Sequence, residues 1–172
     1  MELQEPTKCF IFFSLIWNSK YLNEKEVLKI YPDFIDTFSP AFNPSLRYYS
    51  KEMGNESDLK RIIIFNSKTY TRESLVRFKL EAQELEVKFL NNYNQRIINI
   101  DPGLISLENM ILSTSKNFSH RLYLGQKIFG NLELIFEEGR LKKLPWSYDD
   151  YASEEKIEFF MWLRSRLQAV LA

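Results

Sequence analysis

Residues 9–17 read Cys9-Phe10-Ile11-Phe12-Phe13-Ser14-Leu15-Ile16-Trp17, with one serine among aromatic and aliphatic side chains. A run without polar alternation is typical of a strand that is covered on both faces, so we predict a central strand here. The run Ile62–Phe65, within residues 59–65, indicates a second buried strand. The predicted sheet core consists of Phe10, Phe12, Ile62, Ile64, Leu122 and Leu134.

Three segments have helical patterns. Residues 24–30 follow Asn23, a favourable N-cap, and carry acidic side chains in the first turn. Residues 72–91 place apolar side chains at intervals of three and four, which predicts an amphipathic helix that begins after Thr71 as its N-cap. A C-terminal helix opens near Ser153, and its late turns carry arginines that suit the helix dipole.

The remaining segments predict shorter elements. Residues 33–42 contain a proline and suit an edge or broken strand. Residues 96–100 read as a strand that ends in a turn at Asp101-Pro102-Gly103, and a short helix is expected over 106–113. Residues 119–124 and 128–136 read as a hairpin. A two-residue loop there would place His120 opposite Glu133.

This order of elements mixes strands and helices without a strict βαβ repeat. We therefore expect one α+β domain over residues 1–172, a sandwich in which the main helices pack on one face of a mainly antiparallel sheet. With 45% hydrophobic residues, the chain of 172 residues can bury a sizeable core.

The composition excludes several classes of site. Lys and Arg total 23 and Asp and Glu total 23, so the zero net charge makes nucleic-acid binding an unfavoured prediction. One cysteine and one histidine exclude an internal disulfide, a cysteine-cluster metal site and a two-histidine zinc site. The N-terminus is acidic and the apolar run at 9–17 is too short to span a bilayer, so we expect a cytoplasmic protein without a membrane segment.

Familiar catalytic and nucleotide motifs are absent from the sequence. Gly125 and Gly130 have the glycine spacing of a phosphate loop, but Asn131-Leu132 follows where that loop needs Lys and Ser or Thr. The patterns G-x-G-x-x-G, G-x-S-x-G and H-E-x-x-H do not occur either. The sequence identifies no cofactor and no metal site.

A polar segment remains at residues 113–121, which concentrates hydroxyls, two cations and the single histidine. Together with residues 48–54, 99–103 and 144–151, it resembles the bacterial domain of unknown function four-four-one-six over nearly the whole chain. Members of that family often carry the label "GTP-binding protein", yet this sequence has neither a phosphate loop nor an N-K-x-D motif. The family implies no established reaction. Asp149 stands where the family leads us to expect proline, in the aromatic loop.

The polar segment suggests contacts for an anion. The expected ligand-binding residues are Lys116, Ser119, Arg121 and Tyr148. His120 and Asp101 are the candidate catalytic residues, because both side chains can transfer protons. Each has a plainer alternative: His120 shares a strand face with leucines and can be a packed core residue, and Asp101 can be a turn residue. Tyr148 can likewise plug the core, as aromatic loops often do.

Two functions from different classes fit these residues. The first is a small-ligand or nucleotide-related binding protein that holds a phosphate-bearing molecule at residues 113–121, with enzymatic activity left open. The alternative is a non-catalytic protein-protein interaction module, in which the polar segment is structural and an aromatic loop or a sheet edge meets a partner. Asp101 and Lys116 meet only if the strands they flank are antiparallel, which the sequence leaves open. The oligomeric state is open as well.

Overall fold

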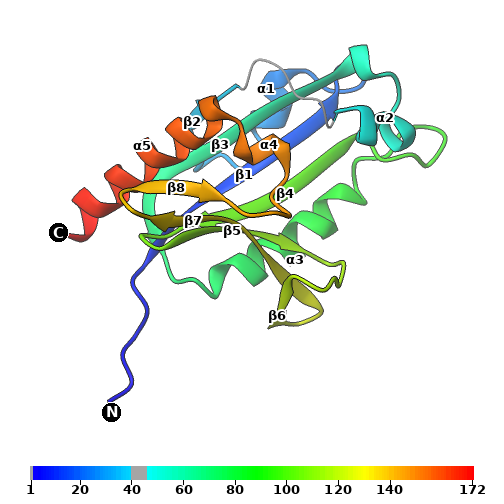
Figure 1. The fold of residues 1–172 in the computed structure, drawn as a ribbon. Coiled ribbons are helices and arrows are strands. Elements are labelled where there is room, and N and C mark those ends of the chain that lie inside the picture. The colour runs from blue at the N-terminus through cyan, green and yellow to red at the C-terminus, as the bar shows by residue number, and fades with distance from the viewer. Residues whose placement is uncertain (1, 40–45) are drawn as a thin grey trace.

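The computed structural model describes residues 2–39 and 46–172. Within these residues, one antiparallel sheet of eight strands has the order β2-β3-β1-β4-β5-β7-β6, and β8 also pairs with β7 (Figure 1). The strands are β1 (Cys9–Asn18), β2 (Asp36–Phe38), β3 (Leu59–Tyr70), β4 (Ile98–Ile105), β5 (Asn109–Thr114), β6 (Arg121–Gly125), β7 (Ile128–Glu137) and β8 (Arg140–Lys143). The helices are α1 (Glu24–Leu28), α2 (Leu46–Met53), the 3₁₀ helix η1 (Glu56–Asp58), α3 (Ser74–Glu86), α4 (Asp149–Ala152) and α5 (Glu154–Leu171).

The α+β class and the antiparallel sheet are confirmed. The expected placement of the main helices on one face is wrong, because α3 and α5 cover opposite faces. Phe13 of β1 packs with Phe78 of α3, while Phe12 points the other way and packs against Phe160 of α5. Successive side chains of a strand point to opposite faces, so β1 needs a helix on each side to bury all its residues.

The central strand at residues 9–17, the buried strand at 59–65 and the hairpin at 119–136 are confirmed. Asn23 caps α1 as expected, in a reciprocal capping box with Glu26. Thr71 is not the cap of α3, because Glu73 occupies that position without a side-chain hydrogen bond. β2 is an edge strand, as expected for residues 33–42, although residues 40–42 lie outside the described part.

The helix expected over residues 106–113 is wrong, because a tight turn and strand β5 occupy this stretch. The backbone N–H of Ser106 donates to the carbonyl of Asn109 over 2.9 Å, and the hydroxyl of Ser106 accepts from the backbone N–H of Asn109 over 3.1 Å. Ser106 therefore caps a turn and begins no helix. Met110 and Leu112 then alternate into the core, as they do in a strand.

The turn expected at Asp101-Pro102-Gly103 is also wrong, because β4 continues through it to Ile105. Pro102 lies opposite Phe13 of β1, and Gly103 lies opposite Phe12. A Cβ atom at residue 103 would lie 2.2 Å from the ring of Phe12, so only glycine allows that ring to cross β4. Five of the six predicted core residues are buried. The exception is Leu122, which is 72% exposed on the edge strand β6.

Candidate functional site

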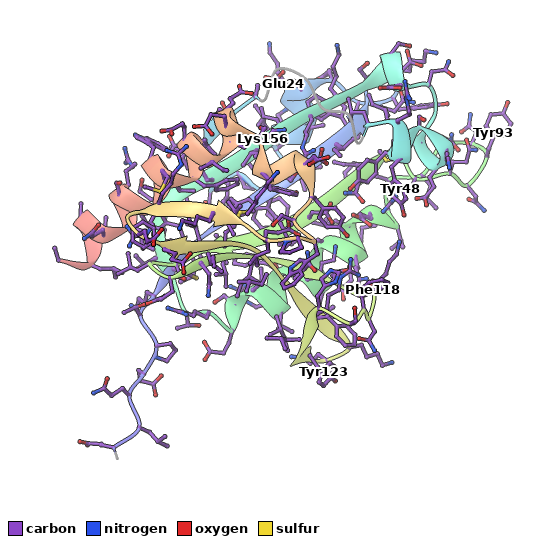
Figure 2. The ribbon with its side chains drawn as sticks, in the orientation of Figure 1. Glu24, Tyr48, Tyr93, Phe118, Tyr123 and Lys156 are labelled. Atoms are coloured by element: carbon purple, nitrogen blue, oxygen red, sulfur yellow. The ribbon has the colours of Figure 1, made fainter. Side chains whose placement is uncertain are left out.

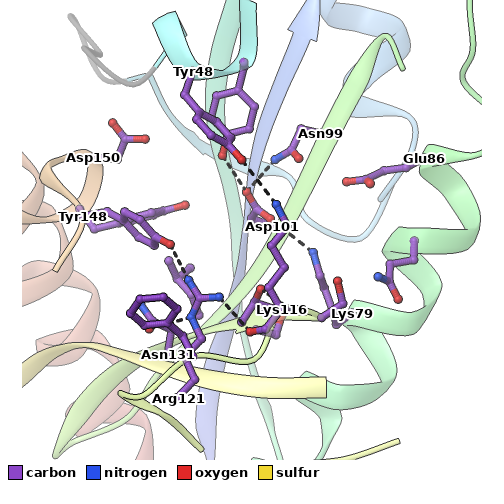
Figure 3. Close-up of a pocket in the computed structure, with 18 of the residues that line it drawn as sticks. Tyr48, Lys79, Glu86, Asn99, Asp101, Lys116, Arg121, Asn131, Tyr148 and Asp150 are labelled. Atoms are coloured by element: carbon purple, nitrogen blue, oxygen red, sulfur yellow. Dashed lines mark hydrogen bonds and ion pairs between the residues drawn. The ribbon is translucent and has the colours of Figure 1, made fainter. Parts of the chain in front are cut away.

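A cavity of about 700 Å³ lies where strands β4 and β5 separate. The two strands are paired only from Gly103 to Ile105, so the first half of β4 has no strand on that edge. Helix α2, helix α3, the loop after β5 and the start of α4 line the opening (Figure 3). The cavity therefore lies in a gap in the sheet, with the middle of β4 at its floor.

The sequence Ile100-Asp101-Pro102 explains why the sheet opens there. The backbone N–H of Ile100 donates to Oε1 of Glu86 on α3 over 2.6 Å, in place of a neighbouring strand. Residues two apart in a strand point their backbone groups the same way, so the nitrogen of Pro102, which has no hydrogen to donate, faces the same edge. The hydroxyl of Ser113 donates to the Pro102 carbonyl over 2.8 Å and closes the end of the gap.

Asp101 lies at the floor of the cavity and is held from three sides. Its Oδ2 accepts from Nδ2 of Asn99 over 2.6 Å and from the hydroxyl of Tyr49 over 3.4 Å. Its Oδ1 lies 3.3 Å from Nζ of Lys79, which is buried on α3. Both carboxylate oxygens of Asp101 are thus engaged, and the group is fixed in position (Figure 3).

A second group of charges surrounds Arg96, next to this floor. The guanidinium of Arg96 lies 3.1 Å from Oε2 of Glu86 and 2.7 Å from Oε2 of Glu52. Burial raises the pKa of Glu86, although the N–H of Ile100 and the charges of Lys79 and Arg96 oppose that effect. The interior end of the cavity therefore pairs its cations with carboxylates and offers mainly hydrogen bonds to a ligand.

The outer rim of the cavity is different, because its cations hold neutral groups. Nζ of Lys116 lies 3.4 Å from the hydroxyl of Tyr48, and NH2 of Arg121 donates to the hydroxyl of Tyr148 over 2.7 Å (Figure 3). NH1 of Arg121 also donates to the backbone carbonyl of Lys116 over 2.8 Å, so the guanidinium lies against the loop that carries Lys116. Within residues 2–39 and 46–172, neither cation forms an ion pair with a carboxylate.

A buried ion pair supports the wall that α4 contributes. NH1 of Arg61 lies 2.7 Å from Oδ2 of Asp150, and both side chains are less than a tenth exposed. The same guanidinium donates to the hydroxyl of Ser14 over 2.9 Å and lies 5.2 Å from the ring centre of Tyr151. A buried pair of this kind fixes the start of α4 against β1 and β3, and so positions the neighbouring Tyr148.

The family model of the Domain of unknown function (DUF4416) matches residues 6–167. The chain belongs to this family. Comparison with curated proteins and with solved structures finds no match. The family resemblance of the sequence is thereby confirmed, and the cavity described above is a feature of a DUF4416 chain. The description of the family states no activity, so the chemistry of the site has to be argued from its residues.

Four of the six predicted site residues line this cavity: Asp101, Lys116, Arg121 and Tyr148. Ser119 and His120 lie outside the lining, and the ring of His120 stacks on Trp146 with 5.2 Å between centroids. The expected pairing of His120 with Glu133 is wrong, because β6 begins at Arg121 and places Asn131 opposite it. Asp101 and Lys116, whose proximity the sequence left open, reach the same cavity.

Sequence reasoning did not identify the contributions of α3. Lys79 and Glu86 lie on the same stripe of the helix as Leu75 and Ala82, at spacings of four, seven and eleven residues from Leu75. Charged side chains within an otherwise buried stripe were the available signal, since such groups are buried only with partners. Tyr48 and Glu52 belong to a segment that was noted for the family resemblance alone.

The requirements of a metal site and of a membrane-spanning helix can also be compared with the described residues. Those residues contain no group of three or more His, Cys, Asp or Glu side chains placed to hold a metal ion. They also include no helix with the length and apolar character needed to cross a membrane.

Proposed function

We propose that the cavity binds a small molecule through a phosphate or a similar anionic group, which the outer rim holds. The observation that carries this proposal is the pair Lys116 and Arg121, two cations at one rim whose partners are neutral oxygens. A cation without a carboxylate partner keeps its charge available, and a guanidinium and an ammonium together are common contacts of phosphate groups.

The two tyrosine hydroxyls extend this set of donors. Each hydroxyl of Tyr48 and Tyr148 already interacts with a cationic donor, Lys116 in one case and Arg121 in the other. A phenol that accepts from a cation directs its own proton elsewhere, so it can donate to an anion at the same place. Arg121 uses three of its five N–H groups in the bonds described here, and the others remain for a ligand.

The rest of the cavity sets the class of molecule. Its volume of about 700 Å³ lies within the range of pockets that enclose small molecules. The interior offers polar groups around Asp101 and Asn99, which suit hydroxyl or amino groups, while the rim tyrosines offer ring faces. A nucleotide or another phosphorylated metabolite fits this combination. Asp101 is the side chain best placed to contact the body of such a ligand.

The first test is a thermal-shift screen of the full chain against nucleotides, phosphorylated sugars and inorganic phosphate. A ligand at a hundred times its dissociation constant stabilises the fold by about 2.7 kcal/mol, which gives a clear rise in Tm. Lys116→Ala should remove most of this rise, because it deletes one of the two rim charges. Lys143→Ala, an exposed lysine on β8 away from the cavity, is the matched control and should keep it.

The interaction-module alternative draws on a different surface. Leu122 and Tyr123 of the edge strand β6 are 72% and 63% exposed, and Tyr123 lies at the outer limit of the molecule (Figure 2). This alternative stays a prediction. It becomes the better explanation if no phosphate-bearing compound stabilises the wild-type chain and Lys116→Ala changes nothing in the screen.

A further inference from the structure

Glu133 lies behind the rim, on β7, and its side chain is fully buried. Its Oε2 accepts from the backbone N–H of Tyr148 over 2.8 Å, and its Oε1 accepts from the side-chain amide of Asn131. Its backbone carbonyl also accepts from the hydroxyl of Ser147. One buried carboxylate therefore connects β7 to the loop that carries Tyr148.

These bonds close into a ring that contains two of the rim residues, Arg121 and Tyr148. Asn131 receives a hydrogen bond on Oδ1 from Nε of Arg121, over 3.3 Å. Arg121 then donates from NH2 to the Tyr148 hydroxyl over 2.7 Å, and the backbone of Tyr148 returns to Glu133. We call these four residues, Glu133, Asn131, Arg121 and Tyr148, the Glu133 ring.

The Asn131 amide fits into the ring only if the group at residue 133 is an acceptor. An ionised carboxylate can only accept, so the amide of Asn131 has to present its NH₂ to Glu133. The carbonyl oxygen of that amide is then left facing Nε of Arg121, which can only donate. If the group at residue 133 also donated, either Asn131 or the N–H of Tyr148 would face another donor, and a buried donor without an acceptor is unfavourable.

We propose that Glu133 is the positioning residue of the anion site: by accepting from Asn131 and Tyr148, it holds Arg121 and Tyr148 in the geometry that binds the ligand. This inference rests on the proposed function, because Arg121 and Tyr148 are the contacts that it concerns. Glu133 itself does not line the cavity, so it acts through its two partners and does not touch the ligand.

The variant that tests the ring is Glu133→Gln, which keeps the shape of the side chain and introduces a donor. The double variant Glu133→Gln with Asn131→Asp should repair the ring, because the new carboxylate accepts from both Gln at 133 and Arg121. Glu137→Gln is the matched control: the same substitution on the same strand, at an exposed residue that pairs with Lys142 on the surface.

Two signals are measured on each protein at pH 8. The ¹H–¹⁵N resonance of Arg121 Nε reports whether that donor is held and protected from exchange. Titration with inorganic phosphate, followed in the same spectra, reports the affinity of the rim. Glu133→Gln should lose the Arg121 resonance and weaken phosphate binding by about tenfold or more, equivalent to about 1.4 kcal/mol. The double variant should regain the Arg121 resonance, which is its readout, because its new carboxylate pairs with Arg121 and competes with phosphate. Glu137→Gln should keep both signals.

The outcomes separate the two proposals. An Arg121 resonance and a phosphate affinity that persist in Glu133→Gln would overturn the role of Glu133. A failure of the double variant to regain the resonance would overturn it as well, since a merely structural carboxylate gives no reason for repair by Asn131→Asp. If the resonance follows the ring in all variants while phosphate binds none of them, including wild type, Glu133 positions Arg121 but the proposed anion site is wrong.

A measurement on the wild type covers the case in which Glu133→Gln does not fold. Burial raises the pKa of Glu133 to about 7, and the charged groups that act on it are Arg121 of β6, which lowers the pKa, and Asp150 of α4, which raises it. Lowering the pH from 8 to 6 should therefore protonate Glu133 and weaken the Arg121 resonance. Exchange of the Arg121 Nε–H proton with water becomes slower as the pH falls, which by itself would sharpen the resonance. An unchanged or sharper resonance at pH 6 would therefore overturn the proposal.

Discussion

Arg121 is the rim residue whose contacts are most specific. Its three bonds leave from Nε, NH1 and NH2 in three directions, to Asn131, Lys116 and Tyr148. Only a planar guanidinium can place donors in this way, because a lysine is a single point charge at the end of a flexible stem. The side chain therefore combines positive charge with a fixed orientation at the mouth of the cavity.

We expect Arg121→Lys to weaken the binding of any ligand found in the screen by about tenfold or more, roughly 1.4 kcal/mol. This variant keeps the positive charge and loses the planar guanidinium with its several donors. The loss of ligand affinity therefore measures what the donor geometry of Arg121 contributes. Isothermal titration calorimetry gives the affinity, and Arg77→Lys, on the exposed face of α3, is the control. Equal affinity in Arg121→Lys would show that charge alone matters at this rim.

Strand β4 shows how one element combines a packing role with an opening for a ligand. Pro102 lacks the donor that a neighbouring strand would need, and Gly103 lacks the side chain that would displace Phe12. The proline lies where the sheet opens, and the glycine lies where pairing with β5 resumes. Asp101, Pro102 and Gly103 would suit a turn in a free peptide, and the strands on either side impose the extended conformation.

Gly103→Ala tests this account of β4. The added methyl group would lie 2.2 Å from the Phe12 ring, and overpacking of this kind costs about 1–3 kcal/mol. Denaturation in urea measures the loss. The double variant Gly103→Ala with Phe12→Leu should be less destabilised than the two single losses added together, because the smaller side chain makes room. If the destabilisations of the two single variants simply add in the double variant, the close contact between residue 103 and the Phe12 ring would be contradicted.

The stability of the whole molecule should depend on pH through Glu133. The folded protein raises the pKa of this group to about 7 from an ordinary value of 4.5, because the carboxylate is buried. Between these two pH values the native state retains a proton that the unfolded state releases. Stability from this group is therefore highest below about pH 4.5 and falls as the pH rises towards 7.

We expect the free energy of unfolding of wild type, relative to Glu133→Gln, to fall by about 3 kcal/mol between pH 4 and pH 8. Chemical denaturation at several pH values measures it, and comparison with the variant cancels the other titrating groups. Parallel pH profiles for the two proteins would contradict the raised pKa. Together with the Glu133 ring, the expected profile means that the protein forms its anion site at some cost in stability.

The local pattern of the chain was sufficient for the elements that carry the core. The apolar runs in β1 and β3, the three-and-four spacing in α3 and the two glycines around the β6–β7 hairpin each depend on nearby residues, and each predicts its element correctly. The family also followed from the sequence. For the site, the sequence identified Lys116, Arg121, Tyr148 and Asp101 as polar residues in suitable places.

Tertiary structure decided the rest, because the deciding partners are distant in sequence. Residues 101–103 extend as a strand since β1 pairs with them, and α3 and α5 cover opposite faces since β1 is apolar on both. An irregularity between Tyr123 and Gly125 shifts the β6–β7 register and places Asn131 opposite Arg121, so the expected pair of His120 and Glu133 does not form, and no local pattern specifies that shift. The cavity itself exists only where β4 and β5 separate and α2, α3 and the Tyr148 loop converge, so its lining could not be read from any single stretch of the chain.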